Sequence, residues 1–290
     1  MIDVVKKGWI WAASAISALF TFIPEPLFNI KQWIPETAFE NCESLNAHVV
    51  EINIIISKVA VFVLIFFIAM LLRSGYLAIR RKVVIKGNNF TIQVEYGDLF
   101  EKSKGGKRVI SFDECFSTHI GNAPEDINPG SICGQYLSVH PDLNISYLIE
   151  KSNIKAARTT SKFKKQTRYE SGTILPNEDD LLLAFAKLDE NGLGRFNSRD
   201  EYLRCLSLLW EEIDRHYSQK DVYIPVLGAG ITRFESASGA SLSQQELLDI
   251  IILSYMLSSH KIRRPNKLCI ICRKADDFSI NRIMEVVSSL

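Results

Sequence analysis

Two apolar runs near the amino terminus constrain this chain more than any other feature of its sequence. Residues 8–24 read GWIWAASAISALFTFIP without a charge, and residues 52–72 contain the stretch VAVFVLIFFIAMLL with Lys58 as their only charge. A helix of about 20 apolar residues crosses the roughly 30 Å hydrocarbon core of a bilayer, and the first run is at the short end of that range. We expect an N-terminal hairpin of two transmembrane helices, at about 8–24 and 52–72.

Charges around these runs predict which side of the membrane each segment faces. Lys6, Lys7, Arg73 and residues 80–82 (RRK) flank the outer ends, whereas the loop 25–51 is acidic with one lysine. Because lysine and arginine accumulate on the cytoplasmic side, we expect both termini in the cytoplasm and the loop outside. A cleavable signal peptide is the alternative for the first run. Its candidate small-residue site, ASA, falls in the middle of the apolar stretch.

The composition of the whole chain indicates which classes of protein and partner it fits. The 290 residues are 47% hydrophobic and 23% charged, which suits a folded domain, and the net charge of +1 gives no overall attraction to nucleic acid. Of six cysteines, only Cys269 and Cys272 have the spacing of a metal-binding or redox pair. No second pair accompanies them, so we expect no metal site. The net charge leads us to expect no nucleic-acid partner, and the scattered cysteines lead us to expect a reducing compartment.

Residues 83–290 alternate short β-rich runs with helical ones, which predicts an α/β layer fold. The runs around GNN at 87–89 indicate a hairpin, and Ser243 with Glu246 forms a capping sequence that marks a helix start. Further strands are expected at residues 108–112, 145–149, 181–186, 222–227 and 267–272, and helices at 199–217, 243–259 and 279–288.

One of these strands runs into IPVLGAGITRF, at residues 224–234. Ligands of α/β sheets settle at the carboxyl ends of strands, and glycine there lets backbone N–H groups approach an anion. The dinucleotide fingerprint would require a glycine in place of Arg233, and the segment at Gly105 and Gly106 lacks the remaining residues of a P-loop. From these residues alone, a phosphate-binding loop and a structural turn both remain open.

A family resemblance bears on that choice. VEYGDLF at 94–100 and IPVLGAGITRF resemble the adenine-binding start and the second phosphate loop of macro domains. GTILP, LLLAFAKLD and LSLLWEEI between them are similar to the membrane effectors of the Thoeris anti-phage systems, in which two membrane helices precede a macro domain. The resemblance implies a three-layer α/β/α macro-like domain with a mixed sheet over 83–290, after a transmembrane hairpin over 1–82.

The resemblance also implies a ligand, an ADP-ribose derivative, and places its contacts. Asp98 would meet the adenine amino group, residues 228–234 would wrap the diphosphate, and NPGSICGQYL would supply the opposite phosphate loop. The expected ligand-binding residues are Asp98, Leu99, Asp113, Ser131, Ile132, Cys133, Gly134, Gln135, Leu227, Gly228, Ala229, Gly230, Ile231, Thr232, Arg233 and Phe234.

The sequence departs from hydrolytic macro domains at one place. Those enzymes carry an Asn-Ala-Ala-Asn stretch after their third strand, whereas VISFDECF stands here. We therefore expect no catalytic residue and no cofactor, but a sensor of an ADP-ribose signal. A hydrolase that depends on Asp113 or Glu114 and a ligand-free interaction module remain the alternatives.

The family implies the remaining partners. The signal would be histidine-linked ADP-ribose, made from NAD by a TIR-domain enzyme, and binding would drive a homo-oligomer to disrupt the bacterial inner membrane. The basic segment 151–168, with seven cations, is expected to be a solvated loop or to meet anionic lipid or a neighbouring subunit.

Overall fold

The computed structural model describes residues 9–10, 13–18, 21, 24–28, 32–35, 47–196, 198–229, 233–234, 242–275 and 278–283. Contacts divide the chain into two compact units, Met1–Arg80 and Arg81–Leu290. The elements are η1 (Glu25–Phe28), α3 (Val49–Ile79), β1 (Lys82–Lys86), β2 (Thr91–Tyr96), α4 (Leu99–Lys102), β3 (Lys107–Asp113), α5 (Ile132–Val139), α6 (Ile145–Ser152), β4 (Ile174–Asn177), β5 (Asp180–Leu188), β6 (Gly194–Phe196), α7 (Arg199–His216), β7 (Val222–Pro225), β8 (Arg233–Phe234), α8 (Gln244–Leu257), β9 (Leu268–Cys272) and η3 (Ile280–Arg282).

The N-terminal unit contains one long apolar helix rather than the expected pair. α3 has 31 residues, and among the described residues it is the helix long and apolar enough to cross a membrane. It contains the expected span 52–72 and extends it at both ends, to Val49 and to Ile79. The expected first span, 8–24, is helical in its described residues 9–10, 13–18 and 21, and its other residues lie mostly outside the described part.

Contacts within this unit join the first apolar run to α3. Ile16 is buried in a small cluster with Ala69, and Trp9 meets the ring of Phe62 edge-on at a centroid distance of 5.5 Å. Most of α3 is nevertheless uncovered, with large apolar side chains such as Leu71 exposed. A surface of this kind marks a place of contact with a membrane or with another protein.

The second unit is built on a mixed sheet, as the sequence predicts. Among the described residues the strand order is β1-β2-β9-β7-β3-β5-β6-β8, with β4 paired to β5. β2, β9, β7, β3 and β5 run parallel, while β1, β4 and β6 pair antiparallel to their neighbours. The carboxyl ends of five parallel strands therefore meet at one edge, which is where an α/β sheet binds ligands.

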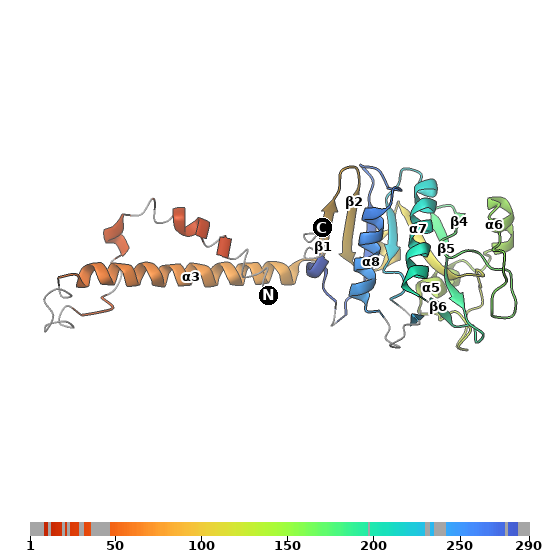
Figure 1. The fold of residues 1–290 in the computed structure, drawn as a ribbon, viewed down its shortest axis with the longest axis horizontal. Coiled ribbons are helices and arrows are strands. Elements are labelled where there is room, and N and C mark those ends of the chain that lie inside the picture. The colour runs from red at the N-terminus through yellow and green to blue at the C-terminus, as the bar shows by residue number, and fades with distance from the viewer. Residues whose placement is uncertain are drawn as a thin grey trace. The chain divides into compact units, whose positions relative to one another are not determined.

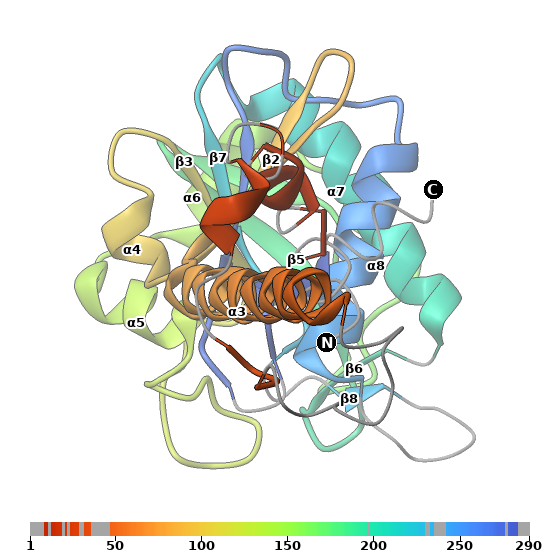
Figure 2. The same cartoon turned by 90° about the vertical axis from the view of Figure 1, so that its left-hand side faces the viewer.

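Helices cover both faces of this sheet (Figures 1 and 2). One hydrophobic core joins the sheet to α7 and α8, with Trp210 and Tyr255 fully buried in it. A second core joins the opposite face to α5 and α6 through Tyr136 and Leu148. The expected α/β class with a mixed sheet is confirmed, and helices lie on both sides of it.

One predicted element is wrong, one lies partly outside the described residues, and several short elements, α5 among them, were missed. Residues 145–149 form helix α6 instead of a strand, because Asn144 caps the helix and Leu148 faces the core one turn after Ile145. The helix expected at 279–288 is described only as the 3-10 turn η3, and residues 284–290 lie outside the described part. Helix α5 was missed because NPGSICGQYL contains small residues that favour a loop reading.

Candidate functional site

A cavity of about 310 Å³ lies at the edge where the parallel strands end. It has the size of a small-ligand pocket, and segments that follow β2, β3, β5, β7 and β9 form its wall. Among the residues expected from sequence, it is lined by Asp98, Leu99, Asp113, Ser131, Ile132, Cys133, Leu227, Gly228 and Ala229. Segments far apart in the chain are thus brought to one site.

Asp98 lies at one end of the cavity, directly after β2. It is the N-cap of α4, and its Oδ1 accepts hydrogen bonds from the backbone N–H groups of Phe100 (2.8 Å) and Glu101 (3.1 Å). Both described bonds use Oδ1, so Oδ2 can accept a bond from a ligand amine. Leu99 beside it is only 3% exposed and offers an apolar wall.

The first turn of α5 forms another part of the wall. Ser131 caps this helix, since its Oγ accepts from Gly134 N (3.0 Å) and donates to Asn128 O (2.7 Å). A Cβ on Gly134 would overlap the carbonyl oxygen of Asn128 and come within 2.9 Å of Pro129 Cα, so the loop can fold back only over glycine. The helix amino terminus supplies N–H groups that favour an anion.

Two residues of this expected loop do not line the cavity. Gly134 lies behind the loop as its packing surface, and Gln135 Nε2 donates to Gly130 O at 3.0 Å. Both were expected to touch the ligand because NPGSICGQYL was interpreted as an extended loop. In the helix, these residues turn away from the cavity and hold the loop from the other side.

The second expected loop follows β7. Leu227 is buried and its carbonyl oxygen accepts a hydrogen bond from the hydroxyl of Tyr202 (2.9 Å). Gly228 has φ +86°, in the left-handed region that favours glycine. Gly230, Ile231 and Thr232 lie outside the described residues, and Arg233 and Phe234 are described only by the backbone of β8, which pairs with β6.

Asp113 ends β3 inside the cavity. Its Oδ1 accepts hydrogen bonds from Cys115 N (2.8 Å) and Ser117 N (3.2 Å). Burial is the largest influence on this carboxyl and raises its pKa above the ordinary value of 3.8, although these hydrogen bonds oppose the shift. Burial likewise raises the pKa of the Cys133 thiol well above its ordinary value, so that side chain is a neutral wall residue.

Sequence comparison identifies the family of the domain that contains this cavity. The family described as "Thoeris protein ThsA, Macro domain" matches residues 92–273, which contain both strand-end segments described above. Thoeris protein ThsA of Bacillus amyloliquefaciens (strain Y2) is 30% identical over 211 residues, covering 69% of this chain and 68% of that protein. The chain belongs to the Thoeris ThsA macro-domain family. It is therefore a Thoeris anti-phage defence protein, and the resemblance to macro domains is confirmed.

Solved structures give more distant similarities. An Oceanobacillus iheyensis macrodomain variant aligns with a TM-score of 0.45 and 9% identity, over 72% of this chain and 97% of that one. A tomato leucine aminopeptidase variant aligns with a TM-score of 0.38 and 12% identity, over 73% of this chain and 38% of that one.

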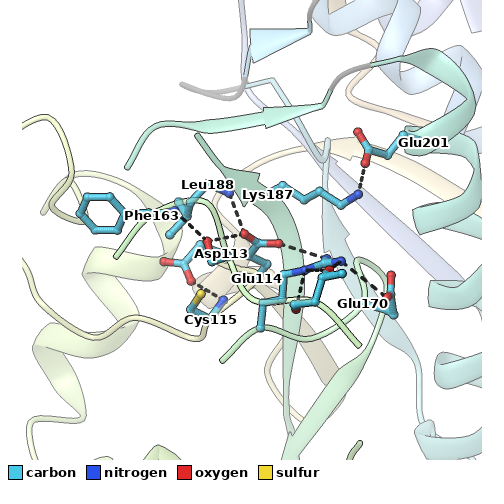
Figure 3. A network of polar contacts seen from close by, with 11 residues as sticks. Asp113, Glu114, Cys115, Phe163, Glu170, Lys187, Leu188 and Glu201 are labelled. Atoms are coloured by element: carbon cyan, nitrogen blue, oxygen red, sulfur yellow. Dashed lines mark hydrogen bonds and ion pairs between the residues drawn. The ribbon is translucent and has the colours of Figure 1, made fainter. Parts of the chain in front are cut away.

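A buried carboxylate anchors the basic segment of this ThsA-type domain beside the cavity (Figure 3). Glu114 is 2% exposed and accepts hydrogen bonds from Ser161 Oγ (2.6 Å), Arg168 Nη1 (3.3 Å) and Leu188 N (3.2 Å). Glu114 does not line the cavity, and through these three donors it holds the segment 151–168 against the end of β5. This segment was expected to be a solvated loop, and it is anchored at Ser161 and Arg168.

Several cavity residues escaped the sequence reasoning. Arg273 follows β9 and Gln244 begins α8, and both line the cavity. Arg273 was within reach of the strand-end rule, since β9 was predicted to end at Cys272 and its parallel pairing would place the next residue at the ligand edge. The others belong to loops with no motif of their own, namely Pro124, Glu125, Asp126, Ile127, Gly192 and Leu193, apart from Asn128, which opens the expected loop NPGSICGQYL but was not named as a contact.

Proposed function

We propose that the cavity binds an ADP-ribose derivative and that this ligand switches the protein into a membrane-disrupting oligomer. The observation that carries the proposal is the set of groups that line the cavity. Asp98 Oδ2 at one end suits the adenine amino group, while the first turn of α5 and the backbone at Gly228 and Ala229 suit a diphosphate. The family to which the chain belongs supports the same ligand class.

Backbone groups would carry most of the phosphate recognition. Among the described cavity residues, Arg273 is the only lysine or arginine, whereas Asp98, Asp113, Glu125 and Asp126 are acidic. A diphosphate would therefore be held by N–H groups at the α5 terminus and after β7, where no side-chain cation is needed. Asp113 would face a ribose hydroxyl and accept a hydrogen bond from it, because the carboxyl lines the cavity.

The signal and its source follow from the family. We propose histidine-linked ADP-ribose, produced from NAD by a partner TIR-domain enzyme during infection, with no cofactor bound by this chain itself. The ligand would favour an assembled homo-oligomer only if that state binds it more tightly than the separate chains do. Assembly would gather the membrane helices at high effective concentration, and the bilayer would lose its integrity.

We assign α3 as a membrane span of the bacterial inner membrane. Its exposed apolar surface supports this assignment, and the positive charges of Arg73 and residues 80–82 support a cytoplasmic macro domain. We further propose that the first apolar run crosses beside it, because Ile16 and Trp9 pack on α3, so that both termini are cytoplasmic. In a chain whose Cys42 is replaced by serine, a cysteine-reactive label applied outside the cell would then miss a cysteine at position 3 and reach one at position 37.

Hydrolysis is a second candidate that rests on Asp113. A buried carboxyl with a raised pKa in a ligand cavity is the kind of group that serves as a general base. We propose binding without turnover, because Oδ1 already accepts two backbone N–H groups and Glu114 is held by three donors. Incubation of the protein with the ligand, followed by chromatography, distinguishes the two: a product that Asp113→Asn abolishes would favour the hydrolase.

The experiment that tests the proposed switch uses vesicles. The full chain is reconstituted in vesicles loaded with a quenched dye, and histidine-linked ADP-ribose is added outside. We expect dye release with the wild type and with Ser198→Ala, which removes a helix cap at a residue that does not line the cavity, and none with Asp98→Ala. Release that does not depend on the ligand, or that Asp98→Ala leaves unchanged, would contradict the proposal.

A further inference from the structure

A second, open groove lies beside the ligand cavity at the β1 side of the sheet. It is formed where three strand ends meet, because β1 runs antiparallel to β2 and β2 runs parallel to β9. Tyr96 N donates to Arg81 O and Gly97 N donates to Cys272 O, each at 3.2 Å, which fixes these ends side by side. The groove is lined by Arg81, Tyr96, Gly97, Asp98, Cys272, Arg273 and Lys274.

Its charge is unbalanced. Arg81, Arg273 and Lys274 are exposed, and none of them forms an ion pair with a described carboxylate. Asp98 is the one acid of the groove, and its Oδ1 already caps α4. By contrast, Arg168 is paired with Glu114 and Arg195 with Asp189. Three cations held together without described counterions form a site for an anion with several acceptor oxygens, such as a phosphate.

The position of Arg81 in the chain indicates where a phosphate for this groove would come from. It follows Ile79, the last residue of α3, by two positions, and this step rests on the proposed function in which α3 spans the membrane. From Leu72, the end of the apolar run, to Ile79 the helix rises about 10 Å, since each residue adds about 1.5 Å. The headgroup layer is about 5–8 Å thick and the Debye length is about 8 Å, so the end of α3 at Ile79 lies within reach of lipid charge, and Arg81 follows it by two residues.

We propose that Arg81, Arg273 and Lys274 bind the phosphate of an anionic phospholipid headgroup. The three residues come from both ends of the macro domain, at positions 81 and 273–274, so the site exists only in the folded domain. This distinguishes it from a flexible basic tail, whose attraction would not depend on the fold.

The groove and the ligand cavity share part of their wall, which gives the lipid a functional consequence. Gly97, Asp98 and Arg273 line both. A headgroup on Arg273 and a ligand on Asp98 therefore contact two adjoining strand ends, which the hydrogen bond from Gly97 N to Cys272 O joins, and each would change the affinity of the other by the same factor. Binding of a lipid headgroup would thus change the affinity of the cavity for its ligand when the protein is at a membrane.

The test uses the full chain purified in mixed micelles that contain equal amounts of phosphatidylglycerol and phosphatidylcholine. Lipid retained per protein is measured by mass spectrometry for the wild type and for the triple variant Arg81→Gln, Arg273→Gln, Lys274→Gln. Arg204→Gln with Arg263→Gln is the control, because it removes exposed cations elsewhere on the domain. Inorganic pyrophosphate is titrated into the same proteins in phosphatidylcholine nanodiscs as the second arm.

We expect the wild type and the control to retain phosphatidylglycerol in preference to phosphatidylcholine. In the triple variant this preference should fall at least about 5-fold, which is the effect of roughly one cation near an anionic surface. Equal preference in the wild type and the triple variant would overturn the proposal. Saturable pyrophosphate binding without any lipid preference would also overturn it, since the source would then be soluble. The proposed function fails separately, by loss of the chain from the membrane fraction or of ADP-ribose binding.

Discussion

Gly134→Ala is the substitution that tests the α5 loop most sharply. The added methyl group overlaps the carbonyl oxygen of Asn128 and stands 3.0 Å from its carbonyl carbon, and both are backbone atoms that cannot rotate away. The loop from Asn128 to Ser131 must therefore shift by on the order of 1 Å to restore ordinary contact. Overpacking of this kind costs about 2 kcal/mol, and alanine in a helix returns about 1 kcal/mol, so the free energy of unfolding should fall by about 1 kcal/mol.

Ligand affinity should fall by more than stability does. Asn128 and Ser131 line the cavity, and a shift of this size breaks one hydrogen bond to a charged phosphate, worth about 1.5–3 kcal/mol. The dissociation constant for ADP-ribose should rise about 10- to 150-fold. Calorimetry on the full chain in detergent measures the affinity, and fluorescence of the buried Trp210 during denaturation measures the stability.

Gly130→Ala is the matched control for this prediction. It makes the same chemical change in the same loop, but the new methyl group meets only the side-chain oxygen of Asn128, at 3.2 Å. We expect affinity and stability close to those of the wild type. A stable Gly134→Ala protein that binds ADP-ribose with the affinity of the wild type would show that this loop does not hold the phosphate.

Three further predictions concern carboxylates. Asp98→Ala should lower the free energy of unfolding by about 1 kcal/mol through the lost α4 cap and should also abolish ligand binding in calorimetry, whereas Ser198→Ala in α7 should lower stability alone. Glu114→Gln should lower the free energy of unfolding, measured by denaturant titration, by about 3 kcal/mol, because Arg168 loses a buried partner. Its control is Glu211→Gln, at an exposed pair, which should lower that free energy by less than about 1 kcal/mol. Equal losses would refute the anchoring role. Burial raises the pKa of Asp113 above 3.8, so the contribution of this carboxyl to stability is present at lower pH and is lost as pH rises through the folded-state pKa. Asp113→Asn should remove this decline of the free energy of unfolding with pH. An unchanged pH profile of unfolding in the variant would contradict the prediction.

The strand-rich part of the domain could be predicted from sequence because its signals are local. The hairpin of β1 and β2 follows from a turn at GNN, β5 and β9 from continuous apolar runs, and the start of α8 from Ser243 and Glu246. Each is specified by residues within a few positions of one another. Asp98 and Gly228 likewise sit directly after strands that the sequence marks.

Features set by distant contacts could not be predicted in the same way. Residues 145–149 pass for a strand until Asn144 is recognised as a helix cap, and α5 depends on a close approach between Gly134 and Asn128 that the sequence alone does not reveal. Glu114 was weighed as a catalytic group because it stands beside Asp113. Its role became clear only once the fold placed Ser161, Arg168 and Leu188 around its carboxylate.

The measurement that tests the central claim most directly is a calorimetric titration of the full chain with ADP-ribose and with histidine-linked ADP-ribose. The Asp98→Ala and Ser198→Ala variants are titrated beside the wild type under the same conditions. The account predicts saturable binding by the wild type and by Ser198→Ala, with the histidine-linked ligand binding more tightly, and no binding by Asp98→Ala. Absence of heat with both ligands in a folded wild-type protein would contradict it, and the cavity would then not be an ADP-ribose site.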